Sequence, residues 1–221
     1  LLRLAERRRV IALELQGHGH TADIDRRLGY DVLGDDIAAV IEHFGLGQAD
    51  LLGYSFGAGA SLRAAIQHPL LVRRLVSVSM PCRRDGWFPE VRAGMDNLGR
   101  SLFGQMSQSP LYAAWKAAAP DPEAFPRLMD KMGELVRSPY DWTEEVRHIR
   151  AATMLVFGDA DSVPASHAAE FYALLGGGLK DADWDGSGKG VNRLAILPGQ
   201  THYDIFESAQ LAAVVDEFLA A

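Results

Sequence analysis

The stretch from Leu51 to Ala60 constrains this chain more than any other. Two apolar residues close a predicted strand, the pattern Gly-x-Ser-x-Gly follows, and a run of small residues then opens a predicted helix. A strand-to-helix turn this tight holds its serine, Ser55, in a strained backbone conformation with the hydroxyl exposed. We expect Gly53 and Gly57 to be required, because a Cβ at either position would clash as strand and helix close on each other.

The Gly-x-Ser-x-Gly pattern alone does not establish a reactive serine, because a glycine-rich turn that happens to contain serine is about equally compatible with it. The rest of the chain supplies the context. Apolar runs predict buried strands, and apolar residues at helical spacing predict helices between them. The predicted strands are 10–15, 50–53, 75–79, 153–158 and 194–197, and the predicted helices are 1–9, 31–44, 61–68, 165–175 and 205–219. This alternation predicts an α/β fold with a mostly parallel, doubly wound sheet.

Residues 82–150, which we call the insert, interrupt this alternation. They predict amphipathic helices separated by prolines, and they are rich in aromatic residues and methionine. We therefore expect a sheet-containing core formed by residues 1–81 and 151–221, with a helical cap formed by 82–150. Apolar helical stripes usually form a core, but we expect some of these residues to line an acyl or hydrocarbon pocket over Ser55. The proline breaks are typical of a lid that opens for substrate.

Three predicted loops at the carboxyl ends of strands carry candidate catalytic residues, and chemistry gathers at that edge of a parallel sheet. They hold Ser55, the acids Asp159 and Asp161, and His202. A serine hydroxyl needs a base to take its proton, histidine titrates near neutrality, and an acid fixes the imidazole tautomer. Either acid could serve, because Asp161 could instead cap the helix predicted after Pro164.

These motifs together resemble the α/β-hydrolase fold superfamily. The resemblance rests on Gly53-Tyr54-Ser55-Phe56-Gly57, Gly158-x-x-Asp161, Pro198-Gly199-x-x-His202 and the Gln16-Gly17-His18-Gly19 loop. It implies that Ser55 is the nucleophile, Asp161 the orienting acid and His202 the base. It favours Asp161 over Asp159 because the family's acid typically lies three residues after the glycine. It also implies that the backbone N–H of Phe56 is one oxyanion-hole donor.

The resemblance departs from the family pattern at the front of the chain. Members usually have three strands before the strand predicted at 10–15, and one of them lies between that strand and the strand at Leu51. The absent part would be on the order of 50 residues. Without it the sheet would have a central gap and two unpaired edges. We therefore expect the sequence to be a fragment, or its N-terminal part to be cleaved, not included or supplied by another chain.

Composition and charge limit the partners, location and cofactors that we expect for this chain. The formal net charge of −7 argues against a nucleic-acid partner, which requires a basic surface. No apolar run is long enough to span a bilayer, and Cys82 is the only cysteine, so we expect a cytoplasmic protein without disulfides. We expect no cofactor and no metal, since His18 and His20 lack further ligands at matching spacing and better fit a loop at the pocket mouth. The other histidines, except His202, are expected to be solvated at helix ends: His43, His68, His148 and His167.

We therefore predict a serine hydrolase that cleaves an ester-like bond of a small, largely apolar substrate, with carboxylesterase as the default and a homodimer allowed for. The same three residue types also serve lactonases, carbon–carbon bond hydrolases, aminopeptidases, acyltransferases and perhydrolases, and the fold does not choose among them. Two alternatives are a ligand-binding protein that retains the three residues without turnover, and an inactive fragment with an incomplete oxyanion hole.

Overall fold

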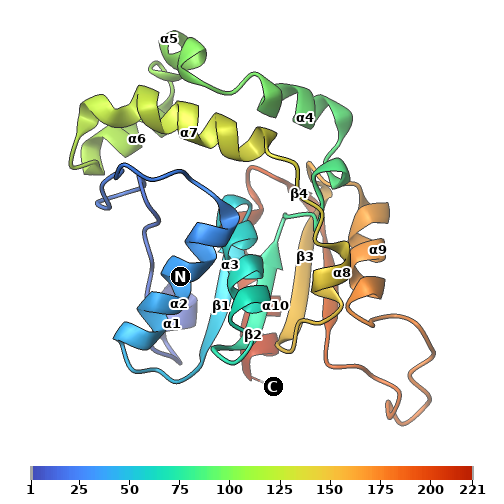
Figure 1. The fold of residues 1–221 in the computed structure, drawn as a ribbon. Coiled ribbons are helices and arrows are strands. Elements are labelled where there is room, and N and C mark those ends of the chain that lie inside the picture. Colours follow the sequence, from blue (N-terminus) through green and yellow to red (C-terminus); the bar gives the residue numbers. More distant parts are fainter. Residues whose placement is uncertain (1, 221) are drawn as a thin grey trace.

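The core is a parallel four-stranded sheet in the computed structural model, which describes residues 2–220. The strand order is β1-β2-β3-β4, so each strand lies beside the next one in the chain (Figure 1). The strands are β1 (Ala49–Tyr54), β2 (Val72–Val78), β3 (Ala152–Ala160) and β4 (Arg193–Thr201). This confirms the predicted α/β fold with a parallel sheet.

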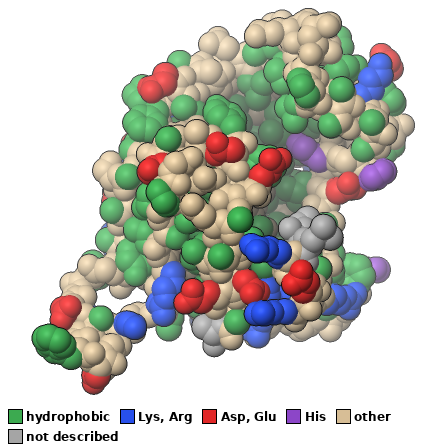
Figure 2. Space-filling model, turned by 180° about the vertical axis from the view of Figure 1, so that it is seen from behind, with side chains coloured by type: hydrophobic (Ala, Val, Ile, Leu, Met, Phe, Trp, Pro, Cys, Tyr) green, Lys and Arg blue, Asp and Glu red, His purple; other side chains and the backbone are tan. Residues whose placement is uncertain are grey.

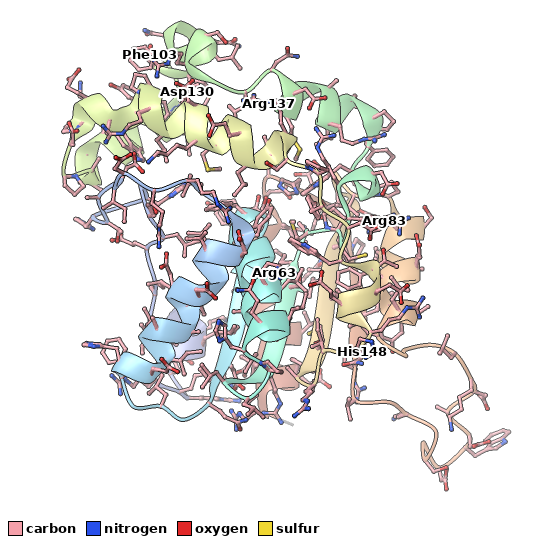
Figure 3. All side chains as sticks on the ribbon, in the orientation of Figure 1. Arg63, Arg83, Phe103, Asp130, Arg137 and His148 are labelled. Atoms are coloured by element: carbon pink, nitrogen blue, oxygen red, sulfur yellow. The ribbon has the colours of Figure 1, made fainter. Side chains whose placement is uncertain are left out.

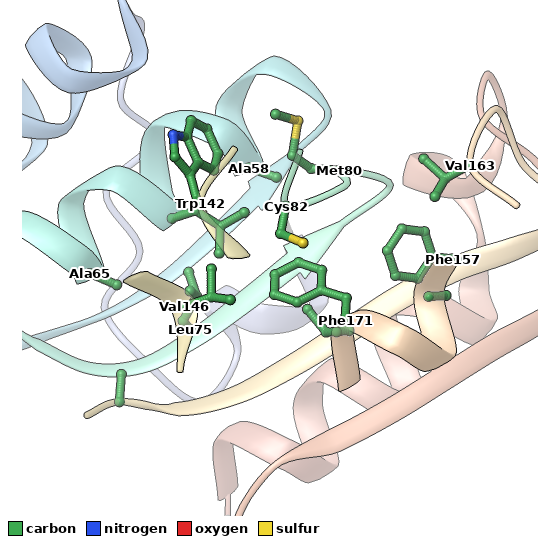
Figure 4. Packing of buried hydrophobic residues seen from close by; sticks show 14 of the residues in the cluster. Ala58, Ala65, Leu75, Met80, Cys82, Trp142, Val146, Phe157, Val163 and Phe171 are labelled. Carbon is green, nitrogen blue, oxygen red and sulfur yellow. The ribbon is translucent and has the colours of Figure 1, made fainter. Parts of the chain in front are cut away.

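Helices cover both faces of this sheet. Leu155 and Phe157 of β3 point to the face covered by α3 (Phe56–Gln67), α8 (Thr143–Val146) and α9 (Ala165–Leu174), and this core is seen from close by in Figure 4. The alternate residues Met154 and Val156 point to the opposite face, where α1 (Leu2–Ala5) and α10 (Ala209–Ala220) pack. Side chains of successive strand residues project to opposite faces, so β3 is apolar on both.

Helix α2 (Tyr30–His43) packs against α3 and forms the outer layer on that side. Its buried residues Leu33, Ile37 and Ile41 recur at helical spacing, which confirms the helix predicted over 31–44. They contact Ala60 and Ala64 of α3, and these small side chains allow the two helices to approach closely.

The insert follows β2 and precedes β3 in the chain; its helices α4 to α7 lie above the sheet, and α8 packs against the sheet face (Figure 1). It contains α4 (Pro89–Asp96), α5 (Phe103–Met106), α6 (Pro110–Ala118), α7 (Phe125–Arg137), α8, and the 3-10 turns η1 (Arg84–Gly86), η2 (Arg100–Leu102) and η3 (Pro122–Ala124). Helix α7 buries Leu128 and Met129 in the cluster that also contains Leu33 of α2. Near the start of the insert, Arg83 pairs with Glu170 of α9 at 2.7 Å; Figure 3 labels Arg83 beside that helix.

The prediction of a strand at residues 10–15 is wrong for the part of the chain that the structure describes. This segment has no regular secondary structure, and Val10, Ile11 and Leu13 are 36%, 39% and 42% exposed. Among residues 2–220, β1 pairs only with β2 and no strand runs beside 10–15. A strand buried on both faces needs neighbouring strands for its backbone hydrogen bonds, so this apolar run stays outside the sheet.

Several predicted boundaries also differ. The helix predicted over 1–9 is confined to α1, with Leu1 outside the described residues, and the closing helix is divided by Ser208 into η4 (Ile205–Glu207) and α10. Strands β3 and β4 continue into segments that the sequence predicts as loops, because Gly158–Ala160 and Leu197–Thr201 remain extended beside each other. Within the described part of the chain, no helix combines the length and apolar character that crossing a bilayer requires.

Candidate active site

Ser55 lies in the turn that joins β1 to α3. Its φ of 50° and ψ of −116° place it outside the conformations that L-residues ordinarily adopt, and its amide donates to the Val78 carbonyl at 2.8 Å. A Cβ at Gly53 would lie 2.3 Å from the Gly57 carbonyl oxygen, so glycine is required there. The same requirement predicted for Gly57 is wrong, because a Cβ at that position would meet nothing within 4 Å. The close approach occurs only on the strand side of the turn.

His202 follows the last residue of β4 and lies between Ser55 and Asp161. Its Nε2 atom is 3.0 Å from Ser55 Oγ, and its Nδ1 atom is 3.0 Å from Asp161 Oδ1. The Tyr54 hydroxyl donates a hydrogen bond to the His202 carbonyl, which fixes the backbone of this loop to the end of β1. The three residues predicted from separate loops are therefore brought into one hydrogen-bonded line.

The Asp161 side chain is fully buried. Its Oδ1 atom also accepts from the Ser162 amide at 2.7 Å, and its Oδ2 atom accepts from the Gly158 amide at 3.0 Å and from the Ser79 hydroxyl. Burial alone would raise the pKa of this carboxyl group. The hydrogen bonds from His202, Ser79 and Gly158 outweigh burial and hold the pKa of Asp161 below its ordinary value. The Asp161 carboxyl group beside the His202 imidazole is therefore ionised near neutral pH.

Ser79 is the site residue that sequence reasoning misses. It is the last residue of the strand predicted at 75–79 and directly follows β2 in the structure, and no spacing or neighbouring motif marks it in the sequence. Its backbone is unusual in having a φ of 56°, but a positive φ at a serine cannot be inferred from the sequence.

Asp159, the alternative acid, lies elsewhere. Its Oδ1 atom accepts from the Gly199 amide at 2.8 Å, and the residue is exposed. It therefore joins the end of β3 to β4, while the fold brings Asp161 to His202.

Phe56, the predicted oxyanion donor, is the first residue of α3. Amides in the first turn of a helix have no carbonyl within the helix to bond, so the Phe56 N–H is available to a ligand beside Ser55. The Phe56 ring stacks on His18 with 5.3 Å between ring centroids. His18 thus packs beside the candidate site, as expected for the loop histidine, whereas His20 turns outward and bonds Glu14 at 3.2 Å.

The insert reaches this site through aromatic side chains. The Trp87 ring lies 5.6 Å from the His202 ring, and Trp87 Nε1 donates to the Tyr140 hydroxyl at 2.9 Å. The next amide, that of Phe88, donates to the Ser162 carbonyl at 3.1 Å. Figure 2 shows a hollow beneath the insert with histidine at its edge and apolar side chains inside it.

A separate cavity of about 370 Å³ lies where the insert meets α2 and α3. Tyr30, Tyr140 and Trp142 contribute aromatic walls, and Arg63 lies at its edge. Ser55, Asp161 and His202 do not line it. Tyr30 packs against Phe56, with 6.0 Å between ring centroids, so this cavity backs onto the candidate site across one layer of aromatic side chains.

The expectation that His167 is solvated at a helix end is wrong, because the residue is only 4% exposed. It lies on the inward face of α9 with Ala168 and Phe171, and its Nε2 atom is 3.8 Å from Cys82 Sγ. Burial lowers the pKa of His167 and raises the pKa of the Cys82 thiol to about 12. Cys82 is therefore a protonated core residue. Among the described residues, no group of three or more histidine, cysteine or acidic side chains is placed to hold a metal ion.

Comparison with known proteins finds relatives of this chain. A 74-residue stretch is 45% identical to 2-hydroxymuconate semialdehyde hydrolase of Pseudomonas sp. (strain CF600), covering 33% of this chain and 26% of that protein. Non-heme haloperoxidase of Rhodococcus erythropolis is 27% identical over 219 residues, which covers 88% of this chain and 75% of that protein. The first curated relatives are matched over a fifth to two fifths of their own length.

Solved structures give the same architecture. A serine hydrolase involved in carbazole degradation superposes with a TM-score of 0.71 at 22% identity, covering 99% of this chain and 82% of that one. A likeness at this identity concerns the fold alone. The family model described as alpha/beta hydrolase fold matches residues 2–189, which is most of the chain. This protein therefore belongs to the α/β-hydrolase fold family.

Proposed function

We propose that this chain is a serine hydrolase that cleaves an ester-like acyl bond of a small, largely apolar substrate through an acyl-enzyme at Ser55. The observation that carries the proposal is the line of hydrogen bonds from Asp161 through His202 to Ser55, with 3.0 Å at each step. Family membership supports it, since several relatives are named as hydrolases.

The geometry supports acylation with each residue in a separate role. Ser55 Oγ attacks the carbonyl carbon while its proton passes to His202 Nε2, and the carbonyl oxygen becomes an oxyanion that accepts from the Phe56 N–H. Asp161 stabilises the imidazolium and fixes Nδ1 as the protonated nitrogen. The tetrahedral intermediate then collapses, and His202 gives its proton to the departing alcohol.

Deacylation repeats these roles with water. His202 Nε2 takes a proton from a water molecule whose oxygen attacks the acyl carbon. As the second tetrahedral intermediate collapses, His202 gives that proton to Ser55 Oγ and the carboxylic acid leaves. The strained backbone at Ser55 serves both steps, because in this conformation Oγ lies 3.0 Å from His202 Nε2.

The surroundings favour an apolar substrate. Trp87 lies against His202 and is 5% exposed, and Phe56, whose ring stacks on His18, directly follows the nucleophile in the chain. An apolar acyl or alcohol group would pack on these rings, and the insert would close over it as a lid.

Carbon–carbon bond hydrolysis is the second candidate. The stretch that is 45% identical to 2-hydroxymuconate semialdehyde hydrolase favours it. In such a reaction the same line of residues would act on a carbon–carbon bond next to a carbonyl group.

Labelling with a fluorophosphonate tests the reactive serine. We expect one adduct in the intact mass of the wild-type protein and none in Ser55→Ala, with the labelling rate of His202→Ala reduced by at least about 10³-fold. No adduct on a folded wild-type protein would contradict the proposal.

A substrate panel then separates the candidate reactions. Release of p-nitrophenol from p-nitrophenyl acetate, butyrate and octanoate reports ester cleavage, and the absorbance of 2-hydroxymuconate semialdehyde reports carbon–carbon cleavage. Turnover of the esters alone supports the esterase, and faster turnover of the semialdehyde supports the second candidate. An adduct without turnover of any probe would favour a ligand-binding protein.

A further inference from the structure

The fold fixes the position of the Ser79 hydroxyl. Its amide donates to the Val156 carbonyl at 2.9 Å, which fixes the residue to β3, and the residue has no exposed surface. Its hydroxyl donates a hydrogen bond to Asp161 Oδ2. The two residues lie 82 positions apart in the chain.

We propose that Ser79 is a positioning residue for the catalytic line: its hydroxyl fixes Oδ2 of Asp161 so that Oδ1 faces His202, and it holds the carboxylate in its ionised form. This inference rests on the proposed function, in which Asp161 orients His202.

The hydrogen bonds around Asp161 support this role. Each carboxylate oxygen receives two donors: His202 and the Ser162 amide on Oδ1, and Ser79 and the Gly158 amide on Oδ2. A carboxylate offers about four lone-pair sites, so all are used and none is left for a proton. Two of the donors are backbone amides, that of Gly158 near the end of β3 and that of Ser162 next to Asp161. Ser79 is the one donor that a side-chain substitution can remove without altering His202.

The backbone conformation supplies an independent argument. Ser79 has a φ of 56°, in the left-handed region that glycine adopts without steric cost. Serine is the less favourable residue there, and what it adds over glycine is the hydroxyl that reaches Asp161. The strain is thus offset by a contact in the site itself.

Few other ionisable groups face Asp161. His202 is its direct partner. Burial first, and then the charge of Asp161, raise the pKa of Tyr54 to about 12, so Tyr54 stays neutral across the working range. Asp159, near the end of β3, and Asp204, after β4, are both exposed. Loss of the Ser79 donor should therefore be felt by Asp161 and, through it, by His202.

Two variants separate the hydroxyl from the backbone. Ser79→Ala removes the hydroxyl and keeps the strained φ, whereas Ser79→Gly removes the hydroxyl and relieves the strain, so that it should fold readily. The matched control is Ser77→Ala, because Ser77 is also fully buried in β2 but its hydroxyl has no hydrogen-bond partner among the described residues.

The readouts are the rate of p-nitrophenyl butyrate hydrolysis from pH 4 to 9 and the ¹³C resonance of the Asp161 carboxyl over the same range. We expect both Ser79 variants to lose about tenfold in kcat with little change in KM, as is typical for removal of a supporting hydrogen bond behind a ligating or catalytic group. We also expect the acid side of the rate profile and the Asp161 midpoint to move to higher pH. Ser77→Ala should match the wild type.

Wild-type rates and midpoints in Ser79→Gly would overturn the inference, as would a loss seen in Ser79→Ala alone, which would assign the effect to backbone conformation. The carboxyl resonance does not depend on turnover. If the wild-type protein fails to react with a fluorophosphonate, the proposed function fails, and the Asp161 midpoint in Ser79→Gly still decides whether Ser79 holds the carboxylate.

Discussion

His202 Nδ1 lies 3.0 Å from Asp161 Oδ1, although 41 positions separate the two residues in the chain. Between them the chain forms α9, the loop 176–192 and β4. The contact exists because β3 and β4 are parallel neighbours whose carboxyl ends meet at one edge of the sheet. Asp159, two residues earlier, bonds the Gly199 amide instead.

This difference between two nearby acids gives the first prediction. Asp161→Asn should reduce hydrolysis by about 10⁴-fold, because an amide can no longer hold His202 in the required tautomer. Asp159→Asn should stay within a few-fold of wild type. The kcat/KM for a p-nitrophenyl ester measures both, and a larger loss in Asp159→Asn would show that the acid has been assigned to the wrong residue.

The same carboxylate makes stability depend on pH. Its folded-state pKa lies below the unfolded value, so its contribution is present above about pH 3.9 and is lost as the pH falls through the folded pKa. Asp161→Asn should cost about 1–3 kcal/mol of unfolding free energy at pH 7, because buried donors lose their acceptor. Urea unfolding should show this cost shrinking as the pH falls below 4, whereas a constant difference would contradict it.

The parallel strands were predictable because their signal is local. Residues 153–158 form a continuous apolar run, and β3 is apolar on both faces, as a strand between two helical layers must be. Ser55, Asp161 and His202 each follow a predicted strand. Because the carboxyl ends of parallel strands lie at the same edge of a sheet, the sequence alone predicted that the three residues lie at that edge.

What the sequence did not reveal depends on neighbours distant in the chain. The apolar run at 10–15 is indistinguishable from a buried strand, and only the lack of a pairing strand among the described residues leaves it exposed. The role of Ser79 depends on a hydrogen bond from β2 to the loop after β3. His167, by contrast, had a readable signal, since Phe171 follows it by one helical turn on the same apolar face.

The turn around Ser55 gives a third prediction, in which two glycines behave oppositely. Gly53→Ala should cost about 1–3 kcal/mol or prevent folding, because its Cβ would meet the Gly57 carbonyl oxygen and Ala58 Cα at 2.3 and 2.6 Å. Gly57→Ala should be neutral or stabilising by up to about 1 kcal/mol, because it sits in the first turn of α3 with open space around it. Chemical denaturation of the two variants is the measurement, and equal losses would refute the asymmetry.

The last prediction concerns Asp23, which joins the loop before α2 to helix α7 of the insert. Its side chain is 2% exposed and accepts from Arg127 Nε at 2.7 Å and Lys131 Nζ at 2.8 Å. Gln16 Nε2, next to Gly17 in the chain, also donates to it at 2.9 Å. Burial opposes ionisation of Asp23, but these donors lower its pKa. One buried carboxylate therefore holds two cations that lie one turn apart on α7.

Asp23→Asn should loosen α7 because the charge that attracts Arg127 and Lys131 is lost while both cations remain. The cost should be about 1–3 kcal/mol, reduced from that of a fully buried pair because Arg127 is half exposed. Amide hydrogen exchange should accelerate roughly tenfold or more across 125–137, since about 1.4 kcal/mol corresponds to a factor of ten. Asp25→Asn is the matched control, because Asp25 lies in the same loop and is exposed. Unchanged exchange in α7 of Asp23→Asn would mean that apolar packing alone, through Leu128 and Met129, holds the insert on the core.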